Sequence, residues 1–471
     1  MIKTNDSNVA LNLFQNGAES IPLPFEVTIN EKLYLCTDIF RLLPGKRLVV
    51  KAQNTNGQQL VIKLFVKRNK GERELIREEQ GYQCAIQAGV NVPRLIFSNN
   101  IDAGYCAIAY QYLENAQLFT NTEEVIETHG DNLFKIALAL HKEGVVHNDF
   151  HLENILIVEN RLYLIDLASL IRIKSGKPLN KHISLSNLAV LIAQFNYKQQ
   201  QLLIERLQQY YLAREWLFKA NEIEIIDAYV DKAWKKRKKD YMKKGLRNCT
   251  LTIYQKNFFQ QYGFQRSFIE EVGEDFLQEV NDLVSKGQIL KAGNSATVVK
   301  VTYAGKVLVI KRYNIKSFGH FLRRCCRSTR AIISWQNGRL LQLLGIATPK
   351  PLGFIENRIG WFRSTAYLIC EQSDGQDMAT VFEKRVPTKN ELIQLENIFE
   401  TFKKYHISHG DFKATNFLIE KPDTIQLIDL DAMREHKNKG RFQRHFAKDK
   451  RRFIANWKNS DIQTAIASIS I

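Results

Sequence analysis

The segment His409-Gly-Asp-Phe-Lys-Ala-Thr-Asn416 decides the fold, because a near copy, His147-Asn-Asp-Phe-His-Leu-Glu-Asn154, stands in the first half of the chain. In both segments the last asparagine stands five positions after the aspartate. Each segment is followed by an apolar run, a turn and a second apolar run that ends in an aspartate, Asp166 or Asp429. Such runs, separated by a turn, predict paired and buried β-strands. Two matches of this kind in one chain make chance a poor explanation.

The repeat continues upstream of these segments. Leu60-Val-Ile-Lys63 and Leu308-Val-Ile-Lys311 are β-branched, apolar runs that end in lysine, and each is followed by a helical pattern and a turn that contains proline. A period of roughly 250 residues predicts two domains of similar architecture. We place them at residues 1–230 and 255–471, joined by a basic linker at 231–254.

The two lysines predict anion binding, because a lone lysine on an apolar strand is costly to bury unless an anion pairs with it. Lys63 and Lys311 are therefore candidates for holding the α- and β-phosphates of a nucleotide. The loops before them, Pro44-Gly-Lys-Arg47 and Gly293-Asn-Ser-Ala296, hold one glycine each, so neither forms a G-x-G-x-x-G motif. Without the downstream aspartates, each lysine would be interpreted as a surface residue of an edge strand.

The downstream polar residues predict magnesium sites. Mg²⁺ prefers oxygen ligands, and one carboxylate and one amide oxygen from adjacent strands can supply them. Asn154 with Asp166, and Asn416 with Asp429, are the candidate pairs.

The remaining aspartate of each loop, Asp149 or Asp411, is the candidate catalytic base that accepts the proton of an acceptor hydroxyl. His147 and His409 are interpreted as loop-bracing residues, not as catalytic ones.

Composition limits the class of protein. The chain has 471 residues, 45% of them hydrophobic, which is enough apolar material for two cores. No run of 18 apolar residues occurs, and Met1 is not followed by the apolar region of a signal peptide, so we expect a cytosolic protein. Seven cysteines without a C-x-x-C pair argue against a disulfide framework and a thiolate zinc site.

Charge predicts an anionic partner. The formal net charge is +18, and basic residues gather at 232–247 and 434–458, with nine and ten Lys or Arg respectively. Phosphorylated glycolipid, the anionic inner leaflet and nucleic acid are the candidates, and nucleic acid is the one we disfavour. The alternative is that each run is only a solvated helix face.

The second half resembles the lipopolysaccharide kinase family of Gram-negative bacteria, which phosphorylates heptose or Kdo of the inner core. Besides the loop at 409–416, the resemblance depends on Gly345-Ile-Ala-Thr-Pro-Lys-Pro, Leu427-Ile-Asp-Leu-Asp-Ala-Met and Arg452-Phe-Ile-Ala-Asn-Trp457. It covers roughly residues 285–457, and residues 42–170 are similar to the family more loosely. The first loop has His151 where the second has Lys413, and in this it also resembles the aminoglycoside and choline kinase branch of the protein-kinase-like superfamily.

The resemblance implies an α+β fold with two tandem protein-kinase-like bilobal domains, each with a β-rich N-lobe and a helical C-lobe. ATP and Mg²⁺ are the implied cofactors, with Lys413 added to the cofactor-binding residues. Such kinases pair the strand lysine with a helix glutamate, and the alignment puts Glu78 there in the first half but Ser334 in the second. Either another acid, such as Glu356 or Glu371, substitutes for it, or phosphate alone holds the second lysine.

The function expected from this resemblance is ATP-dependent phosphorylation of a lipopolysaccharide core sugar, heptose or Kdo, at the cytoplasmic face of the inner membrane. The basic runs would hold the enzyme at that surface. One alternative is that one or both domains are pseudokinase-type binding modules. Another is a protein kinase, or a kinase-like factor associated with nucleic acid.

Overall fold

The computed structural model describes residues 7–101, 104–293, 296–314, 327–420, 423–457 and 460–469. Asn294, Ser295 and Lys458, which belong to segments discussed above, lie outside these residues. The chain divides into two compact units, residues 1–195 with 199–235 and residues 196–198 with 236–471. These are called unit 1 and unit 2 below, and each is described by itself.

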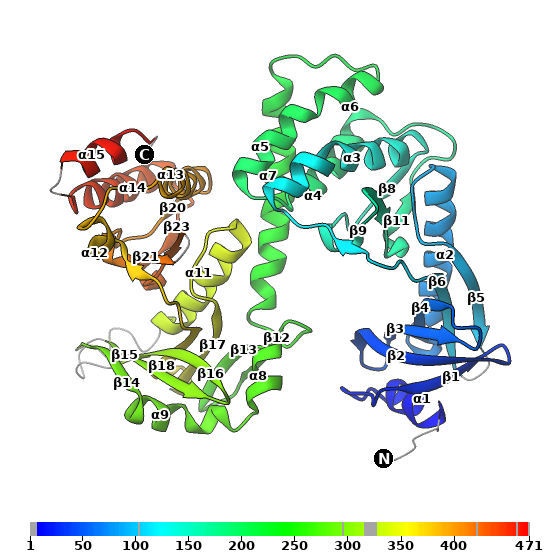
Figure 1. The fold of residues 1–471 in the computed structure, drawn as a ribbon, viewed down its shortest axis with the longest axis horizontal. Helices are drawn as coiled ribbons and strands as arrows, with labels where there is room; N and C mark the ends of the chain where they lie inside the picture. The colour runs from blue at the N-terminus through cyan, green and yellow to red at the C-terminus, as the bar shows by residue number, and fades with distance from the viewer. Residues whose placement is uncertain are drawn as a thin grey trace. The chain divides into compact units, whose positions relative to one another are not determined.

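Unit 1 begins with an antiparallel sheet in the order β1-β2-β3-β4-β6-β5 (Figure 1). Its strands are β1 (Phe25–Ile29), β2 (Lys32–Leu43), β3 (Arg47–Asn54), β4 (Gln59–Val66), β5 (Leu95–Ile101) and β6 (Tyr105–Gln111). Helix α1 (Ser7–Asn16) inserts Phe14 into the core on one face of this sheet. Helix α2 (Gly71–Gln87) follows β4 and packs against β4 and β6. The sheet thus fixes the strand that carries Lys63 between two neighbours, β3 and β6.

The rest of unit 1 is mainly helical, and helices α3 to α6 gather away from the sheet (Figure 1). The helices are α3 (Glu123–Lys142), α4 (Lys181–Ile192), α5 (Tyr197–Arg206), α6 (Gln208–Ala213) and α7 (Glu222–Lys244). Short strands lie between α3 and α4, namely β8 (Val145–His147), β9 (Ile155–Val158), β10 (Arg161–Leu164) and β11 (Leu170–Arg172). Strand β7 (Gln117–Leu118) pairs with β9. The loop at 147–154 therefore runs between β8 and β9.

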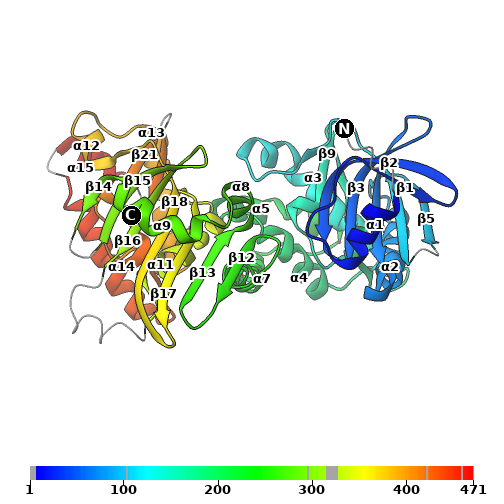
Figure 2. The same cartoon turned by 90° about the horizontal axis from the view of Figure 1, so that it is seen from below.

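Unit 2 has an antiparallel sheet in the order β12-β13-β17-β18-β16-β15-β14 (Figure 2). Its strands are β12 (Thr252–Lys256), β13 (Gln260–Gln265), β14 (Gln288–Ala292), β15 (Ala296–Tyr303), β16 (Lys306–Tyr313), β17 (Pro351–Ile359) and β18 (Phe362–Glu371). Helices α8 (Arg266–Val272) and α9 (Phe276–Lys286) contribute Phe268 and Phe276 to the buried core of this sheet. Strand β16, which carries Lys311, lies between β15 and β18.

Helix α11 (Arg330–Leu344) lies between strands β16 and β17 in the chain, and the rest of unit 2 comes after strand β18. Its helices are α12 (Met378–Phe382), α13 (Lys389–Lys404), α14 (Lys439–Ile454) and α15 (Ser460–Ala467). Its short strands are β19 (Gln376–Asp377), β20 (Ile407–Ser408), β21 (Phe417–Glu420), β22 (Thr424–Leu427) and β23 (Arg434–Glu435). A capping box of Thr388 and Glu391 starts α13. Phe399 of α13, Phe412 of the loop and Phe453 of α14 are buried in mutual ring contact, which fixes the loop between the two helices.

The two units present the same order of elements around their loops. In each, a lysine strand is followed by a helix, two longer strands, a long helix, the loop, a β-hairpin and a further helix. The overall content is mixed α and β. The boundary between the units falls inside helix α7, so residues 232–244 of the first basic segment are helical. In the described part of the chain, no helix is both long and apolar enough to cross a membrane.

Candidate active site

The strand lysine of unit 1 pairs with a helix glutamate. Lys63 Nζ on β4 lies 2.5 Å from Oε1 of Glu78 on α2, and the Glu78 side chain has no exposed surface. The hydroxyl of Tyr110 donates to the other carboxylate oxygen at 3.1 Å. A buried carboxylate is tolerated when it is both paired and hydrogen-bonded. The pair therefore holds the ammonium group of Lys63 in one place.

Asp166 completes this cluster. Its Oδ1 lies 3.5 Å from Lys63 Nζ and 3.7 Å from Nη1 of Arg47. Burial alone would raise the pKa of Asp166, but the charges of Lys63 and Arg47 outweigh it and hold that pKa below its usual value. The backbone of Asp166 is left-handed, with φ of 57°, a conformation in which aspartate is enriched. The structure thus brings Lys63, Glu78 and Asp166 together.

The loop of unit 1 is ordered around Asp149. His151 Nε2 lies 2.8 Å from Asp149 Oδ1, and the Asn154 amide donates to the main-chain oxygen of Asp149 at 2.9 Å. The hydrogen bond from His151 holds the pKa of Asp149 below its usual value, against the opposing effect of burial. The N–H of Ile165 donates to the main-chain oxygen of Asn154 at 2.9 Å, which places Asn154 beside the residue that precedes Asp166.

His147 is a buried, neutral residue at the start of this loop. Its ring stacks on Phe150 with centroids 5.0 Å apart, and burial lowers its pKa to about 4. Asn187 of α4 accepts the backbone N–H of His147 at 3.1 Å and donates to its carbonyl at 2.8 Å. Asn187 therefore fixes the loop to helix α4 through the backbone, and the sequence analysis did not single it out.

The strand lysine of unit 2 has different partners. Lys311 Nζ forms an ion pair with Asp429 and lies 3.7 Å from Oδ2 of Asp431. Burial opposes the charged form, but Tyr313 and these two aspartates outweigh it and raise the pKa of Lys311 above its usual value. Ser334, at the place of the helix glutamate, exchanges a hydrogen bond with the hydroxyl of Tyr313 at 3.1 Å.

Neither glutamate considered as a substitute reaches this lysine in the structure. Glu356 pairs with Arg363 at 3.0 Å, and Glu371 pairs with Lys350 at 3.3 Å. Asp431 is instead the second carboxylate of the Lys311 cluster. Its position two residues after Asp429 was the available signal, because the short 3-10 turn there returns the chain to the same side.

The loop of unit 2 surrounds Asp411 with two cations. Arg452 Nη1 of α14 lies 2.9 Å from Asp411 Oδ1, and Lys413 Nζ lies 3.3 Å from Asp411 Oδ2. The Asn416 amide donates to the main-chain oxygen of Asp411 at 2.8 Å. The N–H of Ile428, the residue before Asp429, donates to the main-chain oxygen of Asn416 at 3.0 Å. Asp411, Asn416 and Asp429 are thus joined through the backbone as in unit 1.

Helix α14 is bonded to the backbone of this loop through Asp449. Asp449 accepts the backbone N–H groups of His409 at 2.7 Å and of Gly410 at 3.1 Å. Burial raises the pKa of Asp449, and burial also lowers that of His409. Gly410 has φ of 83°, and a Cβ there would lie 2.9 Å from the carbonyl oxygen of Ala432, so only glycine fits. The contacts of Asp449 and Arg452 with the loop were not predicted from the sequence, although their spacing of three puts both near one side of a helix.

The candidate metal pairs fit Mg²⁺ by donor type. Asn154 with Asp166, and Asn416 with Asp429, each offer an amide and a carboxylate oxygen from neighbouring chain segments. In each asparagine the NH₂ group is already donated to the loop carbonyl, so the side-chain oxygen is the remaining ligand. Among the described residues, no group of three His, Cys, Asp or Glu is arranged as a self-sufficient metal site. A cation here would need further oxygen ligands, which nucleotide phosphates provide.

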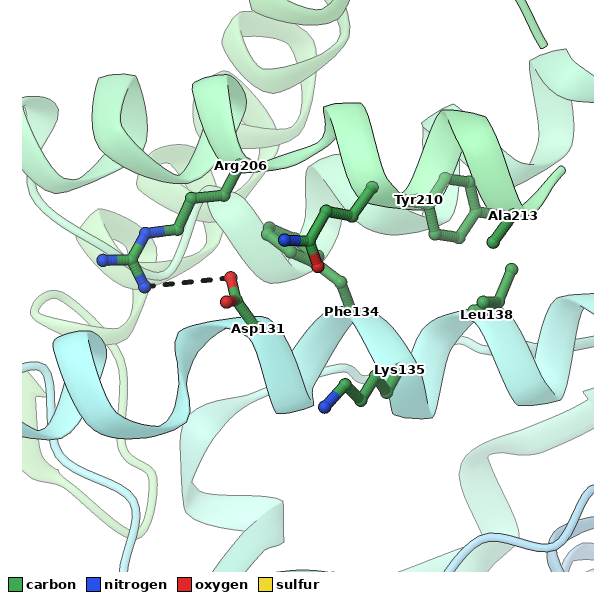
Figure 3. Close-up of a pocket in the computed structure, with 8 residues that line it drawn as sticks. Asp131, Phe134, Lys135, Leu138, Arg206, Tyr210 and Ala213 are labelled. Atoms are coloured by element: carbon green, nitrogen blue, oxygen red, sulfur yellow. Dashed lines mark ion pairs between the residues drawn. The ribbon is translucent and has the colours of Figure 1, made fainter. Parts of the chain in front are cut away.

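A pocket of about 200 Å³ lies elsewhere in unit 1, between α3 and the segment at 206–213 (Figure 3). Asp131 and Arg206 form an ion pair at 3.8 Å across it. Its lining consists of Asp131, Phe134, Lys135, Leu138, Arg206, Gln209, Tyr210 and Ala213. None of the predicted site residues is among them.

Comparison with known proteins addresses the second half of the chain. Residues 274–467 match the Lipopolysaccharide kinase (Kdo/WaaP) family. This segment contains Lys311, Asp411, Asn416, Asp429 and Arg452, and it confirms the resemblance that the sequence indicated there. The match does not extend to unit 1.

Two curated relatives are similar to this chain. The 3-deoxy-D-manno-octulosonic acid kinase of Vibrio vulnificus strain YJ016 is 26% identical over 157 residues, which is 31% of this chain and 65% of the relative. The protein of the same name from strain CMCP6 is 24% identical over 157 residues, which again is 31% of this chain and 65% of the relative. The chain therefore spans 65% of the length of the curated relatives that it matches. Among solved structures, the BubR1 kinase domain is 12% identical, with 35% of this chain and 62% of that chain covered and a TM-score of 0.28.

Proposed function

We propose that unit 2 is an ATP-dependent kinase that phosphorylates a sugar hydroxyl of the lipopolysaccharide core, with Kdo favoured over heptose. One observation carries the proposal. The segment that matches the lipopolysaccharide kinase family contains a partly buried lysine–aspartate pair, Lys311 with Asp429, and a loop that presents Asp411 beside Asn416. The names of both relatives specify Kdo, which supports that sugar as the acceptor.

Each residue has a distinct role in this proposal. Lys311, held by Asp429 and Asp431, binds the α- and β-phosphates of ATP. Asn416 and Asp429 hold Mg²⁺, which neutralises charge on the phosphates when it is bound. Asp411 accepts the proton of the attacking hydroxyl.

Lys413 has a supporting role on the other side of the base. Its Nζ lies 3.3 Å from Asp411, and a cation beside the base would stabilise the negative charge that develops during phosphoryl transfer. Phosphoryl transfer depends mainly on such positioning and charge balance, and the unit 2 loop supplies both.

We further propose that unit 1 is a second kinase-like domain, so that the chain is two bilobal domains in tandem. The support is the repeated order of elements and the Lys63–Glu78–Asp166 cluster, with Asp149 and Asn154 in the loop. Unit 1 either transfers phosphate itself or serves as a nucleotide-dependent binding module. The two basic segments would hold the chain at the anionic cytoplasmic surface of the inner membrane.

The test is transfer from radiolabelled ATP by the purified full chain. Kdo-bearing lipid A, a heptose-bearing core oligosaccharide and a generic protein substrate such as casein are compared as acceptors. The proposal expects label on the Kdo acceptor, dependence on Mg²⁺ and strongly reduced labelling with Asp411→Asn. Label on casein alone would identify a protein kinase, and ATP binding without transfer to any acceptor would identify a pseudokinase.

A further inference from the structure

Helix α14 carries a row of basic side chains that ends at the candidate base. Arg441, Arg444, Lys448 and Arg452 are spaced by three, four and four residues, so they follow one another along a single side of the helix. The first three are exposed, and the side chain of Arg452 is 39% exposed. We call these four residues the α14 stripe.

Three residues of the stripe, Arg441, Arg444 and Lys448, lie outside the packed side of the helix. The buried side of α14 is formed by Phe442, Asp449 and Phe453. Asp449 bonds to the loop backbone, and Phe453 packs against Phe399 of helix α13. In the part of the chain that the structure describes, Arg441, Arg444 and Lys448 have no carboxylate partner. The only acid within the helix, Asp449, is turned to the loop backbone. Three of the four stripe residues therefore carry positive charge that no described carboxylate neutralises, and the fourth, Arg452, pairs with Asp411.

Its position ties the stripe to the acceptor rather than to ATP. Arg452 Nη1 lies 2.9 Å from Asp411 Oδ1, the carboxylate that would accept the proton of the acceptor hydroxyl. Lys311 and Asp429, which define the nucleotide side, form their own ion pair. An anionic group carried by the acceptor next to its reacting hydroxyl would meet Arg452 first and the rest of the stripe beyond it.

Unit 1 lacks this row, which makes it a feature of one unit and not of the shared fold. Asn187 in α4 bonds to the backbone of the unit 1 loop, as Asp449 in α14 does in unit 2. Counted from these anchors, Val190 stands where unit 2 has Arg452, Ser186 where it has Lys448, and His182 where it has Arg444. The carbonyl of Val190 accepts a hydrogen bond from Gln194, whose side-chain oxygen pairs with His151. The acceptor side of unit 1 is thus mostly neutral.

We propose that the α14 stripe is the binding site for the anionic groups, carboxylate or phosphate, of a polyanionic acceptor, and that Arg452 binds the group nearest the phosphorylated hydroxyl. Unit 2 alone would then bind such an acceptor. This rests on the proposed function for the identity of the acceptor, but the binding itself requires no catalysis.

Binding is measured by calorimetric titration of the full chain, without ATP, with deacylated Kdo–lipid A backbone, which carries carboxylate and phosphate and forms no vesicles. The double variant Arg444→Gln/Lys448→Gln is expected to raise the dissociation constant about tenfold, the combined effect of two exposed charge pairs. Arg452→Gln should raise it by a similar factor, and Arg452→Lys should restore most of the affinity. The matched control, Lys437→Gln/Lys439→Gln, removes two exposed charges of the same segment outside the stripe and should change it less than about twofold.

Several results would overturn the inference. These are an absence of binding by the unaltered chain, an unchanged dissociation constant in the stripe variants, and an equal loss in the control. Binding to phosphatidylglycerol–phosphatidylcholine vesicles is measured in parallel. If the stripe variants lose affinity for these vesicles but not for the Kdo–lipid A backbone, the stripe is a membrane-binding surface instead. Circular dichroism and the thermal midpoint verify that each variant is folded. Transfer is scored separately, so binding through the stripe without transfer would reject the proposed function and keep the inference.

Discussion

Lys63 Nζ and Glu78 Oε1 lie 2.5 Å apart in unit 1, and the side chain of Glu78 has no exposed surface. At the corresponding helix position unit 2 has Ser334, whose hydroxyl exchanges a hydrogen bond with Tyr313 and not with Lys311. The two units therefore hold their strand lysines by different means. Unit 1 uses a carboxylate from helix α2, and unit 2 uses two aspartates that follow strand β22.

Glu78→Ala should destabilise unit 1 strongly. Removing one partner of a buried ion pair leaves the other charge uncompensated, which costs about 3–5 kcal/mol in the free energy of unfolding. Glu79→Ala, on the same helix but partly exposed, is the control and should cost less than about 1 kcal/mol. Urea unfolding followed by circular dichroism measures both. Equal costs for the two variants would show that the Lys63–Glu78 pair contributes nothing to stability.

Mg-ATP should bind unit 1 more tightly than unit 2. In unit 1 Glu78 orients Lys63 while Asp166, at 3.5 Å, remains available to a cation, whereas in unit 2 Asp429 is itself the closest partner of Lys311. Titration of the full chain with Mg-ATP should therefore resolve two affinities. Lys63→Gln should remove the tighter site and Lys311→Gln the weaker one. The ordering is rejected if Lys311→Gln removes the tighter site or if the two affinities are equal.

Unit 1 should lose stability as the pH falls from about 6.5 to 4. Burial lowers the pKa of His141 and of His147 to about 4, below the unfolded value of 6.5. Between these values the unfolded chain binds more protons than the folded one, so unfolding becomes more favourable as pH falls, by about 3 kcal/mol per histidine. Urea midpoints at a series of pH values measure the effect. His147→Asn should flatten the dependence, and a midpoint constant over this range in the unaltered chain would contradict the assignment.

Binding to anionic membranes should be reversible and salt-dependent. The run Lys235 to Lys239 lies on helix α7, where it is mostly exposed, and each engaged cation near an anionic surface is worth about 1 kcal/mol. Co-sedimentation with anionic vesicles should therefore weaken steeply as salt rises, and changing these five residues to glutamine should weaken it at low salt. Pelleting that is insensitive to salt, or unaffected by the change, would mean that this run is only a solvated helix face.

Much of the site was predictable because its residues are close in sequence. The loop spacing and the aspartate after the second strand put Asp149 near Asn154, and Asp411 near Asn416, by local geometry alone. The roles of Asp449 and Arg452 were not predictable, because they depend on how a distant helix packs on the loop. In the basic segment at 232–247, the many charged residues favoured a linker, whereas the structure has helix α7 there up to Lys244.

The signal for helix α7 was present all the same. Ile226, Val230 and Trp234 are buried and recur every four residues, which is the periodicity of a helix with one packed face. The high density of lysine after Trp234 favoured the interpretation as a linker instead. The fold of each sheet was predictable only in part, because strand order depends on pairing between segments that are far apart in sequence.

The most direct test of the central claim is the mass of the acceptor after incubation with the full chain and Mg-ATP. The unaltered enzyme should add one phosphoryl group to Kdo-bearing lipid A. Asp411→Asn should reduce the rate by about 10²–10⁴-fold, the usual contribution of a general base, while the protein stays folded. Asp149→Asn, the matched change in unit 1, should leave this product in place if unit 2 performs the transfer. An acceptor of unchanged mass, or an undiminished rate with Asp411→Asn, would contradict the account.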